Sequence, residues 1–312
     1  MYVDDRDWNR YNRQLCERGR ILTLFLRKED LEFKEELRRM NKKKEGRKYK
    51  YPNTIIQAGF SIKCLFHLGY RQLQNLMEDI CLFLRFPIPN FRTFWWRIDV
   101  MERQELKFDL PKGKKIEIAV DSTGLKLAND GEYRTTKYGK RKVWAKMHAN
   151  INIETNEAVN IIITKDNIGD SKKFKPLIDP LKSHVLSVRA DKGYDTVNNF
   201  RYCQENNIQA IIPVKINASP KRKGARQTAV REQFCIPPTH ERLNLFDTLT
   251  RRIYKQKVWK KIVKYGFRWF VEGFYSRFKR IFGEYVFSRK WKNIKKEIVA
   301  KVNILNLFAT MR

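Results

Sequence analysis

Negative charge is scarce in this sequence of 312 residues, which holds 34 Asp and Glu against 66 Lys and Arg and carries a formal net charge of +32. A positive excess of this size opposes compaction by self-repulsion, so it calls for a polyanionic partner. Nucleic acid is the leading candidate, and an anionic membrane surface is the weaker one.

Cysteine and histidine are also scarce, with five and four residues. There is no CxxC and no HxxxH pair, and the one CxxH pair, Cys64 and His67, has no second close pair beside it. Zinc fingers need two such pairs, so the sequence argues against one. We expect scattered, reduced thiols, and oxygen ligands for any metal ion.

Long apolar runs are missing as well. No stretch of about 18 apolar residues occurs, which a membrane-spanning helix would need. The first ten residues, MYVDDRDWNR, contain no apolar core of the signal-peptide kind. A hydrophobic content of 42%, with 13% aromatic residues, argues against general disorder. We therefore expect a folded cytoplasmic protein, associated with the nucleoid and without a membrane partner.

The N-terminal third changes character near residue 50. Residues 1–50 mix charges of both signs and end in RRMNKKKEGRKYK, which predicts a basic arm. Residues 51–110 show helical spacing of Ile, Leu and Phe, interrupted at PIPN because Pro ends helices. This pattern predicts a helical region at 51–110.

A helix, a short break and a basic helix form the outline of a helix-turn-helix unit, with residues 91–106 as the candidate recognition helix. Arg92 and Arg97 are its candidate DNA contacts. A plain helical bundle fits the same spacing equally well. Because an aromatic stripe is more often core than contact surface, we expect Trp95 and Trp96 to pack inside.

From residue 111 the sequence has the texture of an α/β domain. Short alternating or apolar runs predict strands, and two segments between them predict helices. Three strands followed by helix, strand, helix and strand predict the α/β fold class with a mixed sheet. We expect a polar, basic loop or insert at about 216–260, irregular from Ile216, with helices resuming near Glu241 and continuing to the end. The predicted strands are KIEIAVDST, VWAKMHANINIET, EAVNIIITKD, HVLSVRADKGYD and IQAIIPVK, and the helices are DSKKFKPLIDPL and TVNNFRYCQENN.

Three carboxylates stand out by their positions. Asp121 is expected at the end of the first strand, Asp191 at the end of a later strand, and Glu272 on a helix far downstream. Groups at strand ends face the crevice where ligands bind in sheets of this kind. Hard oxygen ligands suit Mg²⁺ or Mn²⁺ beside phosphates, and two such ions can clamp both oxygens in phosphoryl transfer. These residues are the candidate catalytic and metal-binding set.

The segment YGFRWFVEGFYSRFK, residues 265–279, surrounds Glu272 with cations and aromatic rings. On one continuous helix Tyr265, Arg268, Glu272 and Lys279 would share a stripe roughly 60° wide. Cations on that stripe can bind the phosphates that flank a bond, while the carboxylate holds a metal ion. The core face is expected opposite, at Phe267, Val271, Phe274 and Phe278.

The spacing Y-(2)-R-(3)-E-(6)-K of these residues resembles the signature of DDE transposases of bacterial and archaeal insertion sequences, of the insertion-sequence four and five type. AVDST around Asp121 and ADKGYD around Asp191 look like the family's two aspartate motifs, in the same order. The resemblance covers about residues 110–312. It implies an RNase H-like catalytic domain over 111–312 and metal binding by the three carboxylates. It also implies duplex DNA as the partner, bound by a homodimer.

On this basis we expect a transposase that cleaves DNA at the ends of an insertion sequence and joins them to target DNA, using Mg²⁺, with Mn²⁺ as substitute, as two ions. Tyr265, Arg268 and Lys279 are expected DNA contacts. A DNA-binding protein without catalysis, or an RNase H-like nuclease or resolvase, remains the alternative. His148 is expected to be structural, and Asp170 and Asp195 to cap helices.

Overall fold

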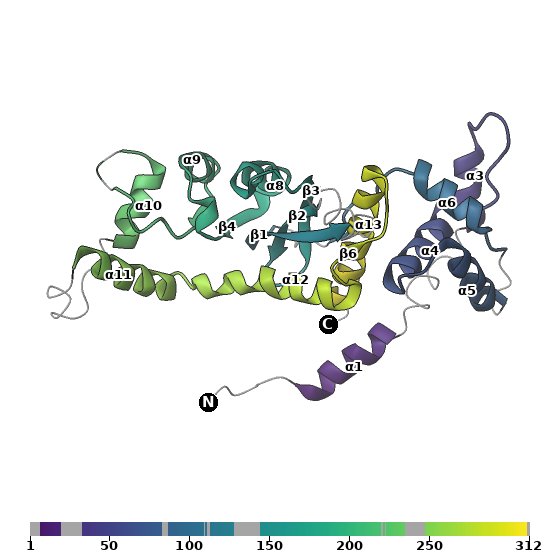
Figure 1. Cartoon of the computed structure of the whole chain (residues 1–312), viewed down its shortest axis with the longest axis horizontal. Helices are drawn as coiled ribbons and strands as arrows, with labels where there is room; N and C mark the ends of the chain where they lie inside the picture. Colours follow the sequence, from purple (N-terminus) through teal and green to yellow (C-terminus); the bar gives the residue numbers. More distant parts are fainter. Residues whose placement is uncertain are drawn as a thin grey trace, which may run out of the picture. The chain divides into compact units, whose positions relative to one another are not determined.

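The computed structural model describes residues 7–19, 33–82, 87–108, 110, 113–127, 144–219, 221, 223–234 and 247–310 (Figure 1). The chain divides into two compact units. We call residues 106–287 the sheet unit, and residues 1–105 with 288–312 the helical unit. No helix in the described ranges has both the length and the apolar character needed to cross a bilayer.

The sheet unit is built on a mixed β-sheet in the order β3-β2-β1-β4-β5. β1 pairs antiparallel with β2 and parallel with β4, and the short β6 pairs with the far end of β1. This is the RNase H-like strand order, so the predicted α/β fold class is confirmed. All five predicted strands are present: β1 (Ile116–Leu127), β2 (Trp144–Asn152), β3 (Ala158–Lys165), β4 (Val185–Arg189) and β5 (Gln209–Ile211), to which β6 (Tyr285–Val286) is added.

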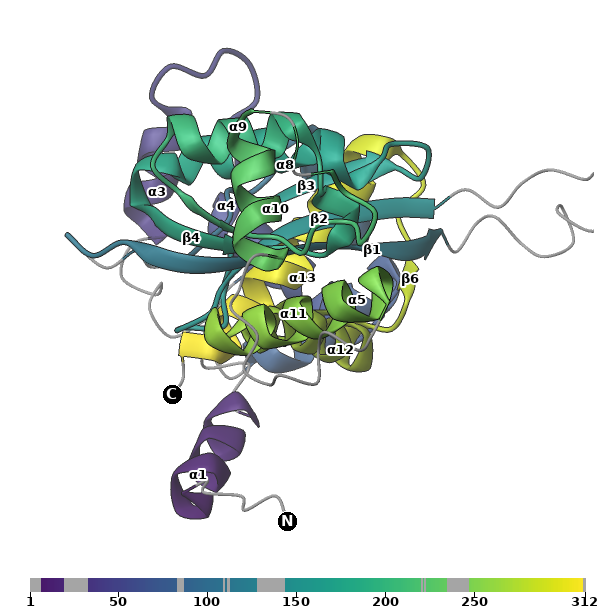
Figure 2. The ribbon, with the colours of Figure 1, turned by 90° about the vertical axis from the view of Figure 1, so that its left-hand side faces the viewer.

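Alternation along β1 gives the sheet two different faces. Ile116, Ile118 and Val120 are buried in an apolar core with α8 (Phe174–Ile178) and α9 (Val197–Glu205). Figure 2 shows α8, α9 and α10 (Ala225–Phe234) on this face, and α11 (Thr248–Ile262) and α12 (Trp269–Phe282) on the other. The side chains at 117, 119 and 121 therefore belong to the face that α12 covers.

Two segments of the sheet unit differ from the prediction. The helix expected at DSKKFKPLIDPL is divided into a 3-10 turn η1 (Asp170–Lys173), the single-turn α8 and a second 3-10 turn η2 (Asp179–His184), where Pro180 can donate no backbone hydrogen bond. The irregular loop expected from Ile216 contains the helix α10, whereas α11 agrees with the expectation that helices resume near Glu241. Residues 220, 222 and 235–246 lie outside the described residues.

The helical unit contains α1 (Trp8–Gly19), α3 (Phe33–Asn41), α4 (Asn53–Leu65), α5 (Tyr70–Leu82), α6 (Phe91–Val100) and α13 (Trp291–Thr310). α4, α5 and α6 pack against one another around Ile56, Leu73 and Phe94. At Gly59 a Cβ would lie 2.6 Å from the Phe94 ring, so only glycine lets α4 and α6 approach this closely. α13 packs on α4 and places Ala300 in the same core.

The boundaries of the helical unit differ from the predicted ones. α13 packs on α4 and belongs to the same compact unit as the N-terminal helices, although the catalytic region was expected to extend to residue 312. The helix expected over 91–106 ends at Val100, with Met101 in extended backbone. Trp95 and Trp96 are 50% and 47% exposed, so the expectation that both pack in the core is wrong.

Candidate functional site

Asp121 lies on β1, and Asp191 follows the neighbouring strand β4. The last pair of this parallel ladder is Ala119 with Arg189, two residues before each aspartate. The negative charge of Asp191 contributes to the raised pKa of the Asp121 carboxyl. Asp121 does not end its strand as expected, since β1 continues to Leu127. Asp191 comes two residues after β4 ends, and its carboxylate accepts a hydrogen bond from the Gly193 N–H at 2.8 Å.

Arg268 connects the first and third predicted carboxylates. One guanidinium nitrogen lies 3.4 Å from Asp121 Oδ2, and another donates to Glu272 Oε1. The Glu272 side chain is 54% exposed and that of Asp121 is 24% exposed, so Glu272 is the carboxylate more open to solvent. Arg268 thus contacts one carboxylate that is 147 positions away in the sequence, Asp121, and one that is 4 positions away, Glu272.

The segment that carries Tyr265 and Arg268 is a 3-10 turn, η5 (Tyr265–Arg268), and α12 begins only at Trp269. The predicted continuous helix over 265–279 is therefore wrong at its start, and Phe267 is 39% exposed instead of forming core. Lys264 precedes the turn with a φ of 51°, in the left-handed region. Its carbonyl accepts a hydrogen bond at 3.3 Å from Arg189, which fixes the turn to β4.

Tyr265 lies among the charges of the site. Burial raises the pKa of Tyr265 to about 12; Arg268 opposes this, and the negative charges of Asp191 and Asp121 add to it. The phenol is therefore a neutral hydrogen-bond donor near neutral pH.

Burial also dominates at Asp121. The pKa of its carboxyl is raised by burial, lowered by the Ser122 N–H and by Arg268, and raised again by Asp191 and Asp170. Below the site, the Tyr275 hydroxyl donates to the Asp121 carbonyl at 2.7 Å. This contact fixes the backbone of β1 to α12 at the residue where the site is built.

Lys279 is not brought to the carboxylates. Its Nζ lies 3.4 Å from Glu284 Oε1, and Lys126 lies 2.8 Å from the other oxygen of Glu284. Lys279 is two helical turns from Glu272, about 10 Å along the axis. As a DNA contact it would meet the strand at a distance from the three carboxylates.

A second polar cluster is formed by Asp170, Lys146, His148 and Thr164. Asp170 Oδ1 lies 2.7 Å from Lys146 Nζ and 3.3 Å from His148 Nδ1, while His148 Nε2 is 3.0 Å from the Thr164 hydroxyl. Burial lowers the pKa of His148 to about 4; Asp170 opposes this shift and Lys146 adds to it. His148 is thus a neutral, buried residue. Asp170 also opens η1, and its charge contributes to the raised pKa of the Asp121 carboxyl.

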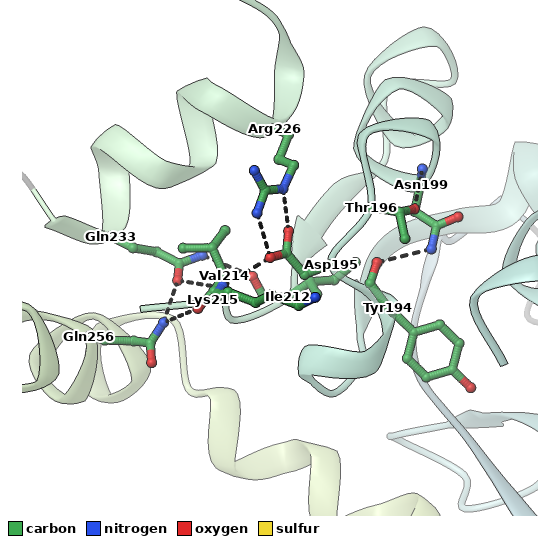
Figure 3. Close-up of polar contacts among 10 residues, drawn as sticks. All are labelled: Tyr194, Asp195, Thr196, Asn199, Ile212, Val214, Lys215, Arg226, Gln233 and Gln256. Carbon is green, nitrogen blue, oxygen red and sulfur yellow. Dashed lines mark hydrogen bonds and ion pairs between the residues drawn. The ribbon is translucent and has the colours of Figure 1, made fainter. Parts of the chain in front are cut away.

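The turn after Asp191 is anchored by a buried ion pair (Figure 3). The Asp195 carboxylate is 0% exposed and receives two hydrogen bonds from Arg226 of α10, at 2.6 and 2.7 Å. The Lys215 N–H donates to Oδ2 at 2.9 Å. Asp195 was expected to cap a helix, but the residue that caps α9 is Thr196. The insert helix α10 therefore holds the segment that carries Asp191.

Further hydrogen bonds in Figure 3 attach the insert helices to the end of β5. Gln233 of α10 donates to the Ile212 carbonyl at 2.8 Å and accepts from the Val214 N–H at 2.9 Å. Gln256 of α11 donates to the Val214 carbonyl at 2.8 Å and to Gln233 at 3.1 Å. Both glutamines are buried, so these bonds satisfy polar groups that water does not reach.

In the helical unit the two predicted DNA contacts have different surroundings. Arg97 is 2% exposed, donates to the Tyr51 carbonyl at 3.0 Å and to Asn53, and stacks on the Tyr49 ring at 4.3 Å. A guanidinium covered in this way cannot reach DNA, so the prediction for Arg97 is corrected to a role in the core.

Arg92 is exposed at the edge of a surface pocket of about 440 Å³. The pocket lies at the N-terminal ends of α5 and α6, and Asn90 caps α6 by accepting from the Thr93 N–H at 2.8 Å. Arg71 contributes a second cation, 4.8 Å above the Phe91 ring. Cations, aromatic rings and two helix N-termini suit an anionic ligand. The lining residues are Gly69, Tyr70, Arg71, Gln72, Phe91, Arg92 and Trp95.

The donors at the carboxylate site suit Mg²⁺ or Mn²⁺, which prefer carboxylate oxygens. Tyr194 gives a structural reason to expect a further polar group there. Its hydroxyl is buried without a hydrogen-bond partner. Burial is the main cause of the raised pKa of this phenol, and the charges of Asp170, Asp121 and Asp191 raise it further. Among the described residues, however, no three His, Cys, Asp or Glu side chains are already placed to hold a metal ion together. Arg268 lies between Asp121 and Glu272 instead.

Comparison with known proteins gives the family. A family model described as "Transposase DDE domain" matches residues 112–307, and a second model of the same description matches residues 16–130. Among solved structures, the chain is similar to one described as "Drosophila P element transposase strand transfer complex", at 12% identity and a TM-score of 0.33, with 93% of this chain and 85% of that chain covered. Since the first model spans well over half of the sequence, the chain belongs to the family of proteins with a transposase DDE domain.

Proposed function

We propose that this protein is a DNA transposase that cleaves the ends of an insertion sequence and joins them to target DNA with the aid of Mg²⁺. The observation that supports the proposal is that Arg268 pairs with Asp121 of β1 and with Glu272 of α12. The negative charge of Asp191, which follows the neighbouring strand β4, also acts on the Asp121 carboxyl. DNA binding alone does not require such a set.

In this proposal Asp121, Asp191 and Glu272 hold the divalent ions, and Mn²⁺ can substitute for Mg²⁺. Bound ions would supply the charge that activates a water and stabilises the leaving 3′ oxygen. Arg268 offsets the negative charge of two carboxylates in the structure. When those carboxylates bind a cation, the guanidinium becomes available for a DNA phosphate, for which its planar donors are suited.

The reaction has two displacements at phosphorus. Water first breaks the phosphodiester at the element's end and leaves a 3′-hydroxyl. That hydroxyl then attacks a target phosphodiester, forming one P–O bond and breaking another. Tyr265, a neutral donor whose ring lies 5.9 Å from the Arg268 guanidinium, would orient a phosphate oxygen, and Lys279 would hold the strand farther along α12.

The helical unit would bind duplex DNA through Arg92 and the pocket beside it. The net charge of +32 supplies sequence-independent affinity that falls steeply with salt. We further propose that a homodimer acts on the two ends, in the cytoplasm where the DNA lies.

Glu272→Gln provides the decisive experiment, because it keeps the size of the side chain and removes its charge. Binding is measured in Ca²⁺ and nicking in Mg²⁺ or Mn²⁺, on a duplex that carries the inverted repeat flanking the gene. We expect nicking to collapse while binding is kept. Glu232→Gln, at an exposed carboxylate on α10, is the matched control and should nick like the parent.

If Glu272→Gln nicks like the parent, the three-carboxylate site is wrong. A parent protein that binds but never nicks would indicate a DNA-binding protein without catalysis. Nicking without joining would indicate a nuclease or resolvase.

A further inference from the structure

Two cations that the family signature does not include lie beside the candidate site. Lys260 of α11 has its Nζ 5.2 Å from the centre of the Tyr265 ring, and the Arg268 guanidinium lies 5.9 Å from the same ring. Lys192 directly follows Asp191 and opens the 3-10 turn η3 (Lys192–Tyr194). Within the described ranges, neither lysine forms an ion pair or a hydrogen bond with a carboxylate.

The position of Lys260 is set by the buried face of α11. Gln256, one turn earlier, is 3% exposed and donates to the Val214 carbonyl. Trp259 is 7% exposed, and its ring centre lies 6.4 Å from that of Tyr265. Both residues fix α11 on the sheet unit. The backbone of α11 therefore holds Lys260 next to Tyr265.

Lys260 and Arg268 come from different elements and both lie within 6 Å of the centre of the Tyr265 ring. Burial lowers the pKa of Lys260, and the charges of Lys192 and Arg268 lower it further. Repulsion of this kind destabilises the folded chain unless an anion lies among the cations. In the proposed function Asp121, Asp191 and Glu272 hold metal ions, so an anion from outside the chain is the partner that suits these cations.

We propose that Lys260 and Lys192 form, together with Arg268, a subsite that binds a phosphate of the DNA strand adjoining the phosphate that is cleaved. This inference rests on the proposed function. A phosphodiester fits because it presents two charged oxygens to cations that approach from different elements. The insert helix α11 then contributes directly to substrate binding, in addition to supporting the fold.

The experiment uses the full chain and the inverted-repeat duplex, with one phosphate at a time replaced by an uncharged methylphosphonate. Affinity is measured in Ca²⁺ for the parent, Lys260→Gln and Lys261→Gln. Lys261 is exposed and points about 100° away around the same helix, so it is the matched control. Lys260→Gln should bind the unmodified duplex about 5- to 10-fold more weakly and reduce the slope of log affinity against log salt by about 1.

The methylphosphonate series identifies the contact. At one or two positions next to the cleaved bond, neutralisation should weaken the parent but have no further effect on Lys260→Gln, since both changes remove the same contact. Equal losses for Lys260→Gln and Lys261→Gln, or full additivity at every position, would overturn the subsite. Glu272→Gln, tested in parallel for nicking, keeps the two proposals separate. If its nicking collapses while Lys260→Gln binds like the parent, only the subsite is refuted.

Discussion

Replacing Arg226 with alanine should destabilise the sheet unit and disturb the turn that carries Asp191. The Asp195 carboxylate is 0% exposed and the Arg226 side chain 16% exposed, so the variant leaves a buried charge with only the Lys215 N–H as a partner. Breaking a buried pair from one side costs about 3–5 kcal/mol. Because Arg226 keeps some contact with water and one oxygen of Asp195 remains bonded, the lower end, about 3 kcal/mol, applies.

This cost can be measured as a change in melting temperature. For a unit of this size each kcal/mol corresponds to roughly 2–4 °C, so Arg226→Ala should melt about 6–12 °C below the parent in differential scanning fluorimetry. Lys223→Ala removes an exposed cation just before α10 and serves as the control, which should melt within about 1 °C of the parent. Arg226→Lys retains the charge but not the two parallel bonds, and should fall between the two.

The same variant tests the link to the candidate site. At a temperature where Arg226→Ala is folded, nicking should fall more than end binding, because the Asp191 turn loses its anchor while the cationic surface is almost unchanged. An unaltered melting temperature would refute the estimate for the ion pair. A lowered melting temperature with unaltered nicking would refute the positioning role.

Three further outcomes follow from individual contacts. Tyr275→Phe removes the 2.7 Å hydrogen bond to the Asp121 carbonyl and should cost about 1 kcal/mol in urea unfolding; no change would mean that the bond contributes nothing. Arg97→Met should lower the melting temperature, whereas Arg92→Gln should lower DNA affinity at an unchanged melting temperature, and the reverse pattern would contradict their assigned places. Burial lowers the pKa of His148 to about 4, against about 6.5 in the unfolded chain. The unfolded state therefore binds more protons below pH 6.5, and stability should fall from there towards pH 4; His148→Gln should show a smaller fall over this window in unfolding measured at several pH values.

The sheet was predictable because its pattern is local. Apolar residues at every second position of β1 indicate a strand with one buried face, and turn residues mark where one strand ends and the next begins. The same reasoning placed Asp121 and Asp191 on adjacent strands. Their metal-binding role stays a prediction.

The burial of Arg97, the helix α10 and the 3-10 turn at Tyr265–Arg268 depend on contacts between distant residues, which the periodicity of the sequence does not predict. Arg97 lies among aromatic residues like a DNA contact, but the carbonyl of Tyr51, 46 positions away, accepts its hydrogen bond. α10 was missed because the basic, polar run around it hides Ala229 and Val230, which are buried. The 3-10 turn at Tyr265–Arg268 replaces helix because Arg189, 75 residues earlier, bonds the Lys264 carbonyl.

The helical unit has a consequence for the way the protein is synthesised. α6 ends at Val100 and α13 begins at Trp291, so about 190 residues are translated between the two. At the usual rates of synthesis this takes roughly 10–40 s, during which the N-terminal helices have left the ribosome without the helix that packs on α4. A message that ends early, before Trp291, would therefore yield a polypeptide whose N-terminal unit lacks part of its core. Truncated products should then compete poorly with the full-length protein for DNA.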